Sequence, residues 1–183
     1  MKNFHAFDAL STTLILGGVR SGKSAFAEKL CLETKAQNHI YIATAHIFDD
    51  EMHARVKKHQ ARRKTHHWHH EVECPFELTK AISRYDEKGN VILIDCLTFW
   101  LTNHFLSEHH SADIYTSIDA LADIIMQSKA TIIMISNEIG LGGIAEHKMT
   151  RQFADIHGEM NQKLAQNVEQ AILVTAGLPL KLK

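Results

Sequence analysis

The stretch Thr12–Ser24 reads TTLILGGVRSGKS, and it decides the fold. An apolar run ends at Leu16, Gly17–Ser24 then satisfies the pattern G-x-x-x-x-G-K-[ST], and a helix-forming run (AFAEKLCLE) follows. Glycines let the backbone curl so that several N–H groups face one anion at the positive end of the next helix. With a strand before it and a helix after it, the pattern predicts a P-loop that holds the phosphates of a nucleoside triphosphate.

Each motif residue has a predicted place in this site. We expect Lys23 to reach the β- and γ-phosphates and the Ser24 hydroxyl to ligate Mg²⁺. A second Mg²⁺ anchor is normally an acid at the carboxyl end of a neighbouring buried strand, and Asp95, which ends VILID, fits that place. Asp95 could instead cap the helix that begins near Thr98, and the two roles can coexist. The predicted phosphate contacts are Gly17, Gly18, Val19, Arg20, Ser21, Gly22, Lys23 and Ser24.

Short, nearly continuous apolar runs recur along the chain, which is typical of strands buried on both faces of a mainly parallel sheet. Stretches with helical spacing lie between them. The alternation predicts an α/β protein, a P-loop NTPase-like three-layer fold with a mostly parallel central sheet flanked by helices. The predicted strands are Thr12–Leu16, Ile40–Ala45, Val91–Asp95, Thr131–Ser136 and Ala171–Ala176; the predicted helices are Ser24–Thr34, Asp50–Arg63, Phe76–Tyr85, Tyr115–Gln127 and Gln152–Asn167.

The length of 183 residues predicts one nucleotide-binding domain over residues 11–183, preceded by an N-terminal extension over residues 1–10. A net charge of -1 gives no global electrostatic reason to expect a nucleic-acid partner. No apolar run approaches the roughly 18 residues that span a bilayer, and the N-terminus lacks the apolar core of a secretory signal, so we expect a cytoplasmic protein. Three widely spaced cysteines argue against a disulfide framework.

Histidine is unusually frequent, with 14 in the chain, and four of them surround Trp68 at positions 66, 67, 69 and 70. Structural zinc needs regularly spaced ligands, and no cysteine pair supplies a second half-site here. A solvated loop or strand edge is therefore favoured over a metal site for this histidine cluster.

A second polar segment follows the second predicted strand, with acids at 49–51 at the start of a predicted helix and bases further along it. Arg55 and His59 are four residues apart and share a helix face, and Arg62 lies nearby. A histidine flanked by arginines near a triphosphate can act as a nucleophile or general base. The same pattern also suits an exposed helix whose charges complement the helix dipole.

Several motifs in order resemble a known family. GGVRSGKS, YIATA followed by DDEM and R-V-x-x-H, DCLTFWLTN, SNEIGLG, RQFADIHGEMNQKLA and the terminal AGLPLKLK are together similar to the bifunctional adenosylcobinamide kinase / adenosylcobinamide-phosphate guanylyltransferase family of cobalamin biosynthesis. The resemblance runs from about Thr12 to the C-terminus. A P-loop alone fits many functions, whereas this ordered set is specific.

The resemblance implies two reactions at one nucleotide site. A nucleoside triphosphate, GTP or ATP, phosphorylates the aminopropanol hydroxyl of adenosylcobinamide, and GTP then donates GMP to that phosphate with release of pyrophosphate. The second reaction passes through a guanylylated histidine, which the motif places at His59, with His53 as the alternative. The family also implies a homotrimer.

Other positions carry over less firmly, namely Thr44 and Ala45 after the second strand, Arg62, and Glu73 as a contact to guanine or ribose. Glu71 rivals Glu73, because WHHEVECP is one residue longer than the family's spacing. Asn137, Glu138, Asn161 and Gln162 lie in matching segments without an assigned role. The alternatives are a small-molecule kinase without guanylyl transfer, and a nucleotide-dependent regulatory switch.

Overall fold

The structure, a computed structural model, describes residues 11–46, 57, 61, 66–107 and 114–183. Within these residues seven strands form one sheet in the order β3-β2-β4-β5-β1-β6-β7. The strands are β1 (Thr12–Gly17), β2 (Asn38–Ala43), β3 (His70–Glu73), β4 (Asn90–Asp95), β5 (Thr131–Asn137), β6 (Gln170–Thr175) and β7 (Leu178–Lys181). The helices are α1 (Lys23–Leu32), α3 (Leu78–Tyr85), α4 (Leu97–Leu106), α5 (Ile114–Gln127) and α6 (Lys148–Asn167), with a 3-10 turn, η1, at Gly140–Gly142.

Parallel pairing dominates the sheet. β1 pairs in parallel with β5 and β6, β4 pairs in parallel with β2 and β5, and β3 pairs in parallel with β2; only β7 is antiparallel, beside β6. Every residue of β1 is buried, which explains why its sequence is a continuous apolar run rather than an alternating one. The six parallel strands therefore end at one common edge of the sheet.

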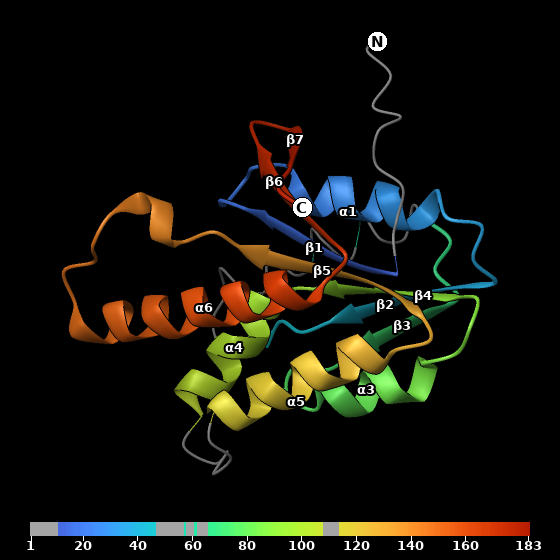
Figure 1. Cartoon of the computed structure of the whole chain (residues 1–183), viewed down its shortest axis with the longest axis horizontal. Coiled ribbons are helices and arrows are strands. Elements are labelled where there is room, and N and C mark those ends of the chain that lie inside the picture. Colours follow the sequence, from blue (N-terminus) through green and yellow to red (C-terminus); the bar gives the residue numbers. More distant parts are fainter. Residues whose placement is uncertain (1–10, 47–56, 58–60, 62–65, 108–113) are drawn as a thin grey trace.

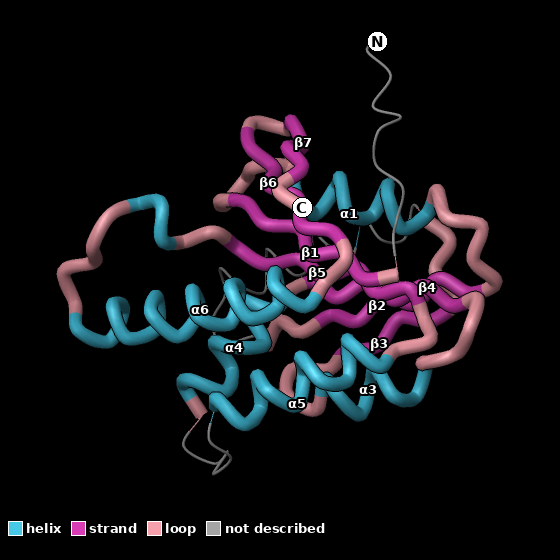
Figure 2. Tube along the Cα trace, in the orientation of Figure 1, coloured by secondary structure: helices cyan, strands magenta, loops and turns pink. Residues whose placement is uncertain are grey.

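Helices cover both faces of the sheet, and Figure 1 shows α1 on one face and α3, α4, α5 and α6 on the other. Figure 2 shows the strands as the middle layer of the same arrangement. Two apolar cores match these layers. The α1 core includes Ile15, Leu30 and Ile133, and the larger core on the opposite face includes Leu14 and Trp100. The predicted three-layer α/β fold with a mostly parallel sheet is confirmed.

All five predicted strands are present, with ends that shift by one or two residues, and so are four of the predicted helices. Two strands were not predicted, and helix α4 was expected only through its start near Thr98. β3 reads HEVE and lies at the sheet edge with three exposed residues, so it has no apolar run, and β7 contains Pro179. α4 carries apolar residues on more than one face, which hides its helical period.

Two predicted segments lie largely outside the described residues. The extension over residues 1–10 is one of them. The helix predicted for Asp50–Arg63 is the other, and its two described residues, Lys57 and Ala61, are helical. Among the described helices, none has the length and apolarity to cross a bilayer.

A single carboxylate joins the end of α3 to the turn before β5. Asp86 Oδ1 accepts hydrogen bonds from the Ser128 hydroxyl at 2.6 Å and from the backbone N–H groups of Lys129 at 2.7 Å and Ala130 at 2.9 Å. Partial burial raises the pKa of the Asp86 carboxyl, but these hydrogen bonds to its ionised form outweigh burial, so the pKa lies below its ordinary value.

We predict that Asp86→Ala lowers the free energy of unfolding by about 1–2 kcal/mol at neutral pH, because two backbone N–H groups lose their acceptor. Since the folded-state pKa is depressed, this stability is fully present above the unfolded value of about 3.9 and is lost as pH falls through the folded value. Urea unfolding of both proteins at about pH 7 and about pH 3 measures the change.

Glu87→Ala is the matched control, since it removes an exposed acid at the next position and should change stability by less than about 0.5 kcal/mol. Equal losses in the two variants, or an Asp86→Ala deficit that stays the same at low pH, would contradict this role of the ionised Asp86.

Candidate functional site

The predicted P-loop joins β1 to α1 by a tight bend. Gly22 has φ 94°, in the left-handed region, and α1 begins at the next residue. A Cβ atom at Gly17 would lie 2.5 Å from the Val174 carbonyl oxygen, so only glycine fits there. The bend closes on itself, because Ser21 N–H donates to the Gly18 carbonyl at 3.2 Å. The geometry is that of a phosphate cradle at a helix N-terminus.

Lys23, the first residue of α1, directly follows this bend and is 9% exposed. Its Nζ donates a hydrogen bond to the Gly18 carbonyl at 3.1 Å, which holds the ammonium group over the loop. Burial lowers the pKa of Lys23, while the nearby Cys96 and Asp95 act in the opposite direction. A polyphosphate in the cradle would supply the negative charge that this partly desolvated cation lacks.

The predicted metal ligands lie on two elements that face the same edge. Ser24 is half-buried in the first turn of α1, and Asp95 is the last residue of β4, two strands from β1 in the sheet. Tyr41 donates its hydroxyl proton to Asp95 Oδ2 at 2.6 Å, which orients the carboxylate. A hydroxyl and a carboxylate are hard oxygen donors, so together with phosphate oxygens and water they fit Mg²⁺. Cys96, not Asp95, is the N-cap residue of α4.

Thr44 has a structural task at the same edge. It is fully buried, its hydroxyl donates to the Cys96 carbonyl at 2.6 Å, and Cys96 N–H donates back to that hydroxyl at 2.8 Å. The side chain therefore ties the end of β2 to the turn after β4. Ala45 follows it and is half-buried.

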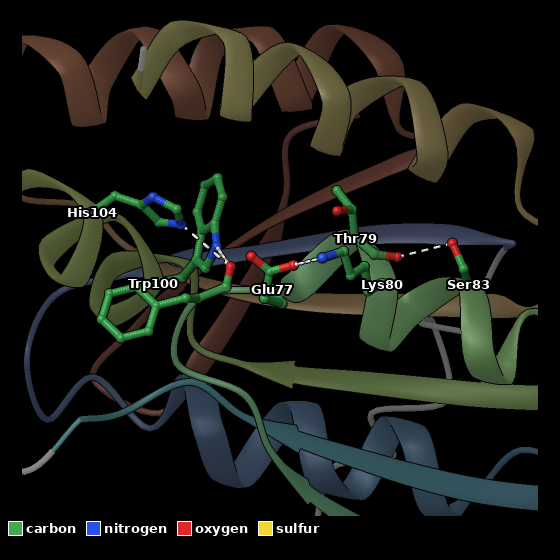
Figure 3. A network of polar contacts seen from close by, with 7 residues as sticks. Glu77, Thr79, Lys80, Ser83, Trp100 and His104 are labelled. Carbon is green, nitrogen blue, oxygen red and sulfur yellow. Dashed lines mark hydrogen bonds and ion pairs between the residues drawn. The ribbon is translucent and has the colours of Figure 1, made fainter. Parts of the chain in front are cut away.

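Helix α4 holds the loops that leave β2 and β3. Asn103 Nδ2 donates to the carbonyls of Thr44 and Pro75, at 2.8 Å each. Trp100 Nε1 donates to the Phe76 carbonyl at 2.9 Å, and His104 Nε2 lies 3.3 Å from the same oxygen. Figure 3 shows the Trp100 and His104 rings converging on the segment that leads into α3, where Glu77 also pairs with Lys80. These contacts explain the tryptophan and the asparagine of LTFWLTN.

Register decides which acid of β3 is nearer the site. Glu73 pairs with Ala43, and Ala43 pairs with Asp95, so Glu73 stands level with Asp95 at the carboxyl edge. With about 4.8 Å between neighbouring strands, their backbones are roughly 10 Å apart. Glu71 pairs with Tyr41, two residues further from that edge. The register therefore favours Glu73 over Glu71.

The turn between β6 and β7 supports the P-loop, a contact that sequence reasoning missed. Gly177 has φ 77°, and its N–H donates to the Ser21 carbonyl at 2.8 Å. A Cβ atom at Gly22 would lie 3.2 Å from Gly177 Cα, so the two glycines allow a close approach. The glycine in the terminal AGLPLKLK was the available signal.

The end of β5 also touches the P-loop, since Glu138 N–H donates to the Gly17 carbonyl at 3.0 Å. Asn161, which the sequence left without a role, donates to the Asn137 carbonyl at 3.0 Å. Gln162, the next residue on α6, is exposed.

The histidine cluster lies along the edge of the sheet beside β2. His69 Nδ1 accepts from the His39 N–H at 3.0 Å, and His66 Nε2 lies 3.8 Å from Glu28 Oε2. Across the described part of the chain, no three His, Cys, Asp or Glu side chains gather as a metal centre.

The predicted nucleophile lies outside the described residues. This holds for His59, for its alternative His53, and for Arg62. The described chain reaches residue 46 directly after the end of β2, at the same edge as the P-loop.

Known proteins match this chain along almost its whole length. The model of a family described as cobinamide kinase / cobinamide phosphate guanyltransferase matches residues 13–182. The bifunctional adenosylcobalamin biosynthesis protein CobP of Pseudomonas aeruginosa is 39% identical over 170 residues, covering 93% of this chain and 96% of its own. The corresponding CobU protein of Salmonella typhimurium is 34% identical over 182 residues, covering 93% and 98%.

Solved structures share the fold at much lower identity. An ATPase from the type III secretion system of pathogenic bacteria aligns with a TM-score of 0.55 at 12% identity, covering 90% of this chain and 51% of that one. The flagellar accessory protein FlaH of Methanocaldococcus jannaschii aligns with a TM-score of 0.50 at 14% identity, covering 94% and 77%. These likenesses concern the fold alone, and they agree with the P-loop NTPase type of fold.

We predict that Gly22→Ala weakens binding of a fluorescent GTP analogue by about tenfold or more, because alanine in the left-handed region costs roughly 1–2 kcal/mol and its Cβ meets the β6–β7 turn. Gly142→Ala is the control, since that position has open space and an ordinary backbone conformation. Unchanged affinity in Gly22→Ala would show that the bend does not need its left-handed residue.

Proposed function

The chain belongs to the cobinamide kinase / cobinamide phosphate guanyltransferase family, and we propose that it performs both reactions at the edge formed by the P-loop and Asp95. It would phosphorylate adenosylcobinamide and then transfer GMP from GTP to adenosylcobinamide phosphate. The observation that carries this proposal is the buried Lys23 over a glycine bend, with Asp95 on the same edge. A simple kinase and a regulatory switch share that grip but need no nucleophilic histidine.

In the kinase step the chain positions charge and does little covalent chemistry. The backbone N–H groups after Gly17 bind the phosphates, and Lys23 stabilises negative charge on the β- and γ-phosphates. Ser24 and Asp95 would hold Mg²⁺, which when bound offsets charge on the transferring phosphoryl group. The substrate hydroxyl oxygen bonds to the γ-phosphorus as the bond to the β-phosphate oxygen breaks, the nucleoside diphosphate leaves, and the hydroxyl proton is released to water. The donor is GTP or ATP.

In the second step we assign the nucleophile to His59. Its imidazole nitrogen bonds to the α-phosphorus of GTP as the bond to the β-phosphate breaks, and pyrophosphate leaves. A phosphate oxygen of adenosylcobinamide phosphate then bonds to the α-phosphorus while the nitrogen–phosphorus bond breaks. The products are adenosylcobinamide-GDP and free His59. A neutral imidazole is a suitable nucleophile near pH 7.

Two further residues of this proposal would contact GTP, one at the guanine and one at the phosphates. Glu73 would accept hydrogen bonds from guanine N1 and N2, and Arg62 would pair with phosphate charge. The assignment of Glu73 is supported by the strand register, which places it level with Asp95. The assignment of Arg62 rests on the resemblance alone.

We also place the protein in the cytoplasm as a homotrimer without a nucleic-acid partner. Three free, buried cysteines suit a reducing compartment. Leu178, Leu180 and Leu182 are each more than half exposed at the edge strand and C-terminus, which favours association of chains. Light scattering in solution tests the trimer, and the mass of a single chain would contradict it.

We expect GTP labelled at the α-phosphate to leave label on the denatured protein, and His59→Ala to abolish that label. A phosphoramidate is labile to acid, so brief acid treatment should release the label. His53→Ala is the matched arm. Label that survives in His59→Ala and disappears in His53→Ala would show that His53, not His59, is the nucleophile. Absence of label from the wild type would favour a kinase without the guanylyl step.

We predict that Glu73→Gln lowers the preference for GTP over ATP by about 10- to 100-fold, because hydrogen bonds to a charged acceptor contribute roughly 1.5–3 kcal/mol. Competition between GTP and ATP for a fluorescent nucleotide measures the preference. Glu71→Gln should leave it unchanged. The reverse outcome would show that the β3 register does not select the guanine contact.

A further inference from the structure

Four buried polar side chains gather beneath the carboxyl end of β5, on the face opposite the P-loop. They are Thr98 of α4, Ser136 of β5, and His157 and Asn161 of α6, with exposed fractions of 7%, 0%, 1% and 5%. Burying polar groups costs free energy unless they are hydrogen-bonded, and apolar residues would fill this space without that cost. We therefore infer that the cluster has a role beyond packing.

The four side chains bond to one another around His157. The Thr98 hydroxyl lies 3.0 Å from His157 Nε2, and the Ser136 hydroxyl lies 3.4 Å from the same nitrogen. Ser136 also donates to Asn161 Oδ1 at 2.7 Å. His157 thus links its own helix, α6, to α4 and to β5 on the same face of the sheet.

The imidazole is neutral, because burial lowers the pKa of His157 to about 4. Asn161 Nδ2 approaches His157 Nδ1 at 3.5 Å, and Nδ2 is a donor because it bonds to the Asn137 carbonyl. Nδ1 is then the acceptor, and Nε2–H faces the Thr98 and Ser136 hydroxyls. A leucine of similar size could neither donate to the two hydroxyls nor accept from Asn161.

This cluster grips one peptide group on each side of Asn137. The Asn137 N–H donates to the Thr98 hydroxyl at 2.8 Å, and the Asn137 carbonyl accepts from Asn161 Nδ2 at 3.0 Å. The next N–H, that of Glu138, donates to Gly17 in the P-loop. Three residues, Thr98, Asn137 and Glu138, therefore connect His157 to Gly17 at the start of the P-loop.

The side chain of Asn137 points toward the nucleotide side. Ser136 faces α6, and neighbouring strand residues alternate, so Asn137 faces the α1 layer. Gly17 is its register partner on β1, at the spacing of about 4.8 Å between adjacent strands. Among the described residues, hydrogen bonds are recorded for its backbone and none for its amide.

We propose that Asn137 contacts the terminal phosphate beside Lys23, and that His157 is a positioning residue that fixes Asn137 through Thr98 and Asn161. The Asn137 amide N–H would donate to a phosphoryl oxygen whose charge rises during transfer. This inference rests on the proposed kinase function and adds a contact to it. His157 itself touches no substrate.

A double-mutant cycle tests the proposal on the full chain, with phosphorylation of adenosylcobinamide as the assay. Asn137→Ala should lower kcat about 100-fold, as loss of one preorganised donor does. His157→Leu should lower kcat about 10-fold or more with little change in KM. In the double variant kcat should equal that of Asn137→Ala alone, because His157 acts through the side chain already removed. Multiplied losses would overturn the positioning role.

Stability is separated from positioning by two further variants. Thr98→Val keeps the side-chain volume, removes the hydroxyl that binds the Asn137 N–H, and should reproduce the kcat loss of His157→Leu even if that variant folds poorly. Leu164→Ala removes a fully buried side chain from the same helix outside the cluster, and its folded fraction should keep the wild-type kcat. Equal kcat losses in Leu164→Ala and Thr98→Val would overturn the proposal. His157→Gln can donate and accept, and it should recover part of the activity.

Failure of the kinase assignment would be visible in the wild type, which would then not phosphorylate adenosylcobinamide. The affinity for a non-hydrolysable GTP analogue would then be measured for the same single and double variants. Coupled losses for His157 and Asn137 would still support the positioning role, and independent losses would refute it.

Discussion

Six parallel strands end at one edge of the sheet, and five of them, β1, β2, β4, β5 and β6, are largely buried. The rest of the molecule follows from that constraint. Continuous apolar strands leave no place for polar chemistry within the sheet, because an unpaired polar group there is costly. Strand ends escape this limit, since their last backbone groups lie beyond the ladder. Gly17 and Asp95 both lie at such ends. The proposed phosphate site and the proposed metal anchor therefore both depend on strand alignment.

The edge is held in shape mainly by helices on the other face of the sheet. α4 reaches the loops after β2 and β3 through Trp100 and Asn103, and α6 reaches the end of β5 through Asn161. On the P-loop side, Gly177 holds Ser21. Loops that bind a ligand carry few internal contacts of their own, so such outside bonds keep them in a binding geometry before a nucleotide arrives.

In this arrangement the residues proposed to bind the triphosphate are separate from the residue proposed to form a covalent bond. The proposed phosphate site consists of backbone N–H groups, Lys23 and two oxygen ligands on rigid elements, and it would serve a triphosphate in either proposed reaction. The proposed covalent residue, His59, belongs to the chain that leaves β2. One cradle can thus serve attack at the γ-phosphorus and attack at the α-phosphorus, with the attacking group supplied from a different element in each case.

The sequence alone determined the features that depend on local order: the P-loop, the five buried strands with their continuous apolar runs, and the family that the ordered motifs resemble. Each is readable because strand burial and glycine geometry leave their mark within a few neighbouring residues. Only the tertiary structure placed Glu73 level with Asp95 and Glu71 two residues further back, gave Gly177 its contact with the P-loop, and brought His157 beneath Asn137. These depend on strand register and helix packing, which join residues far apart in the chain.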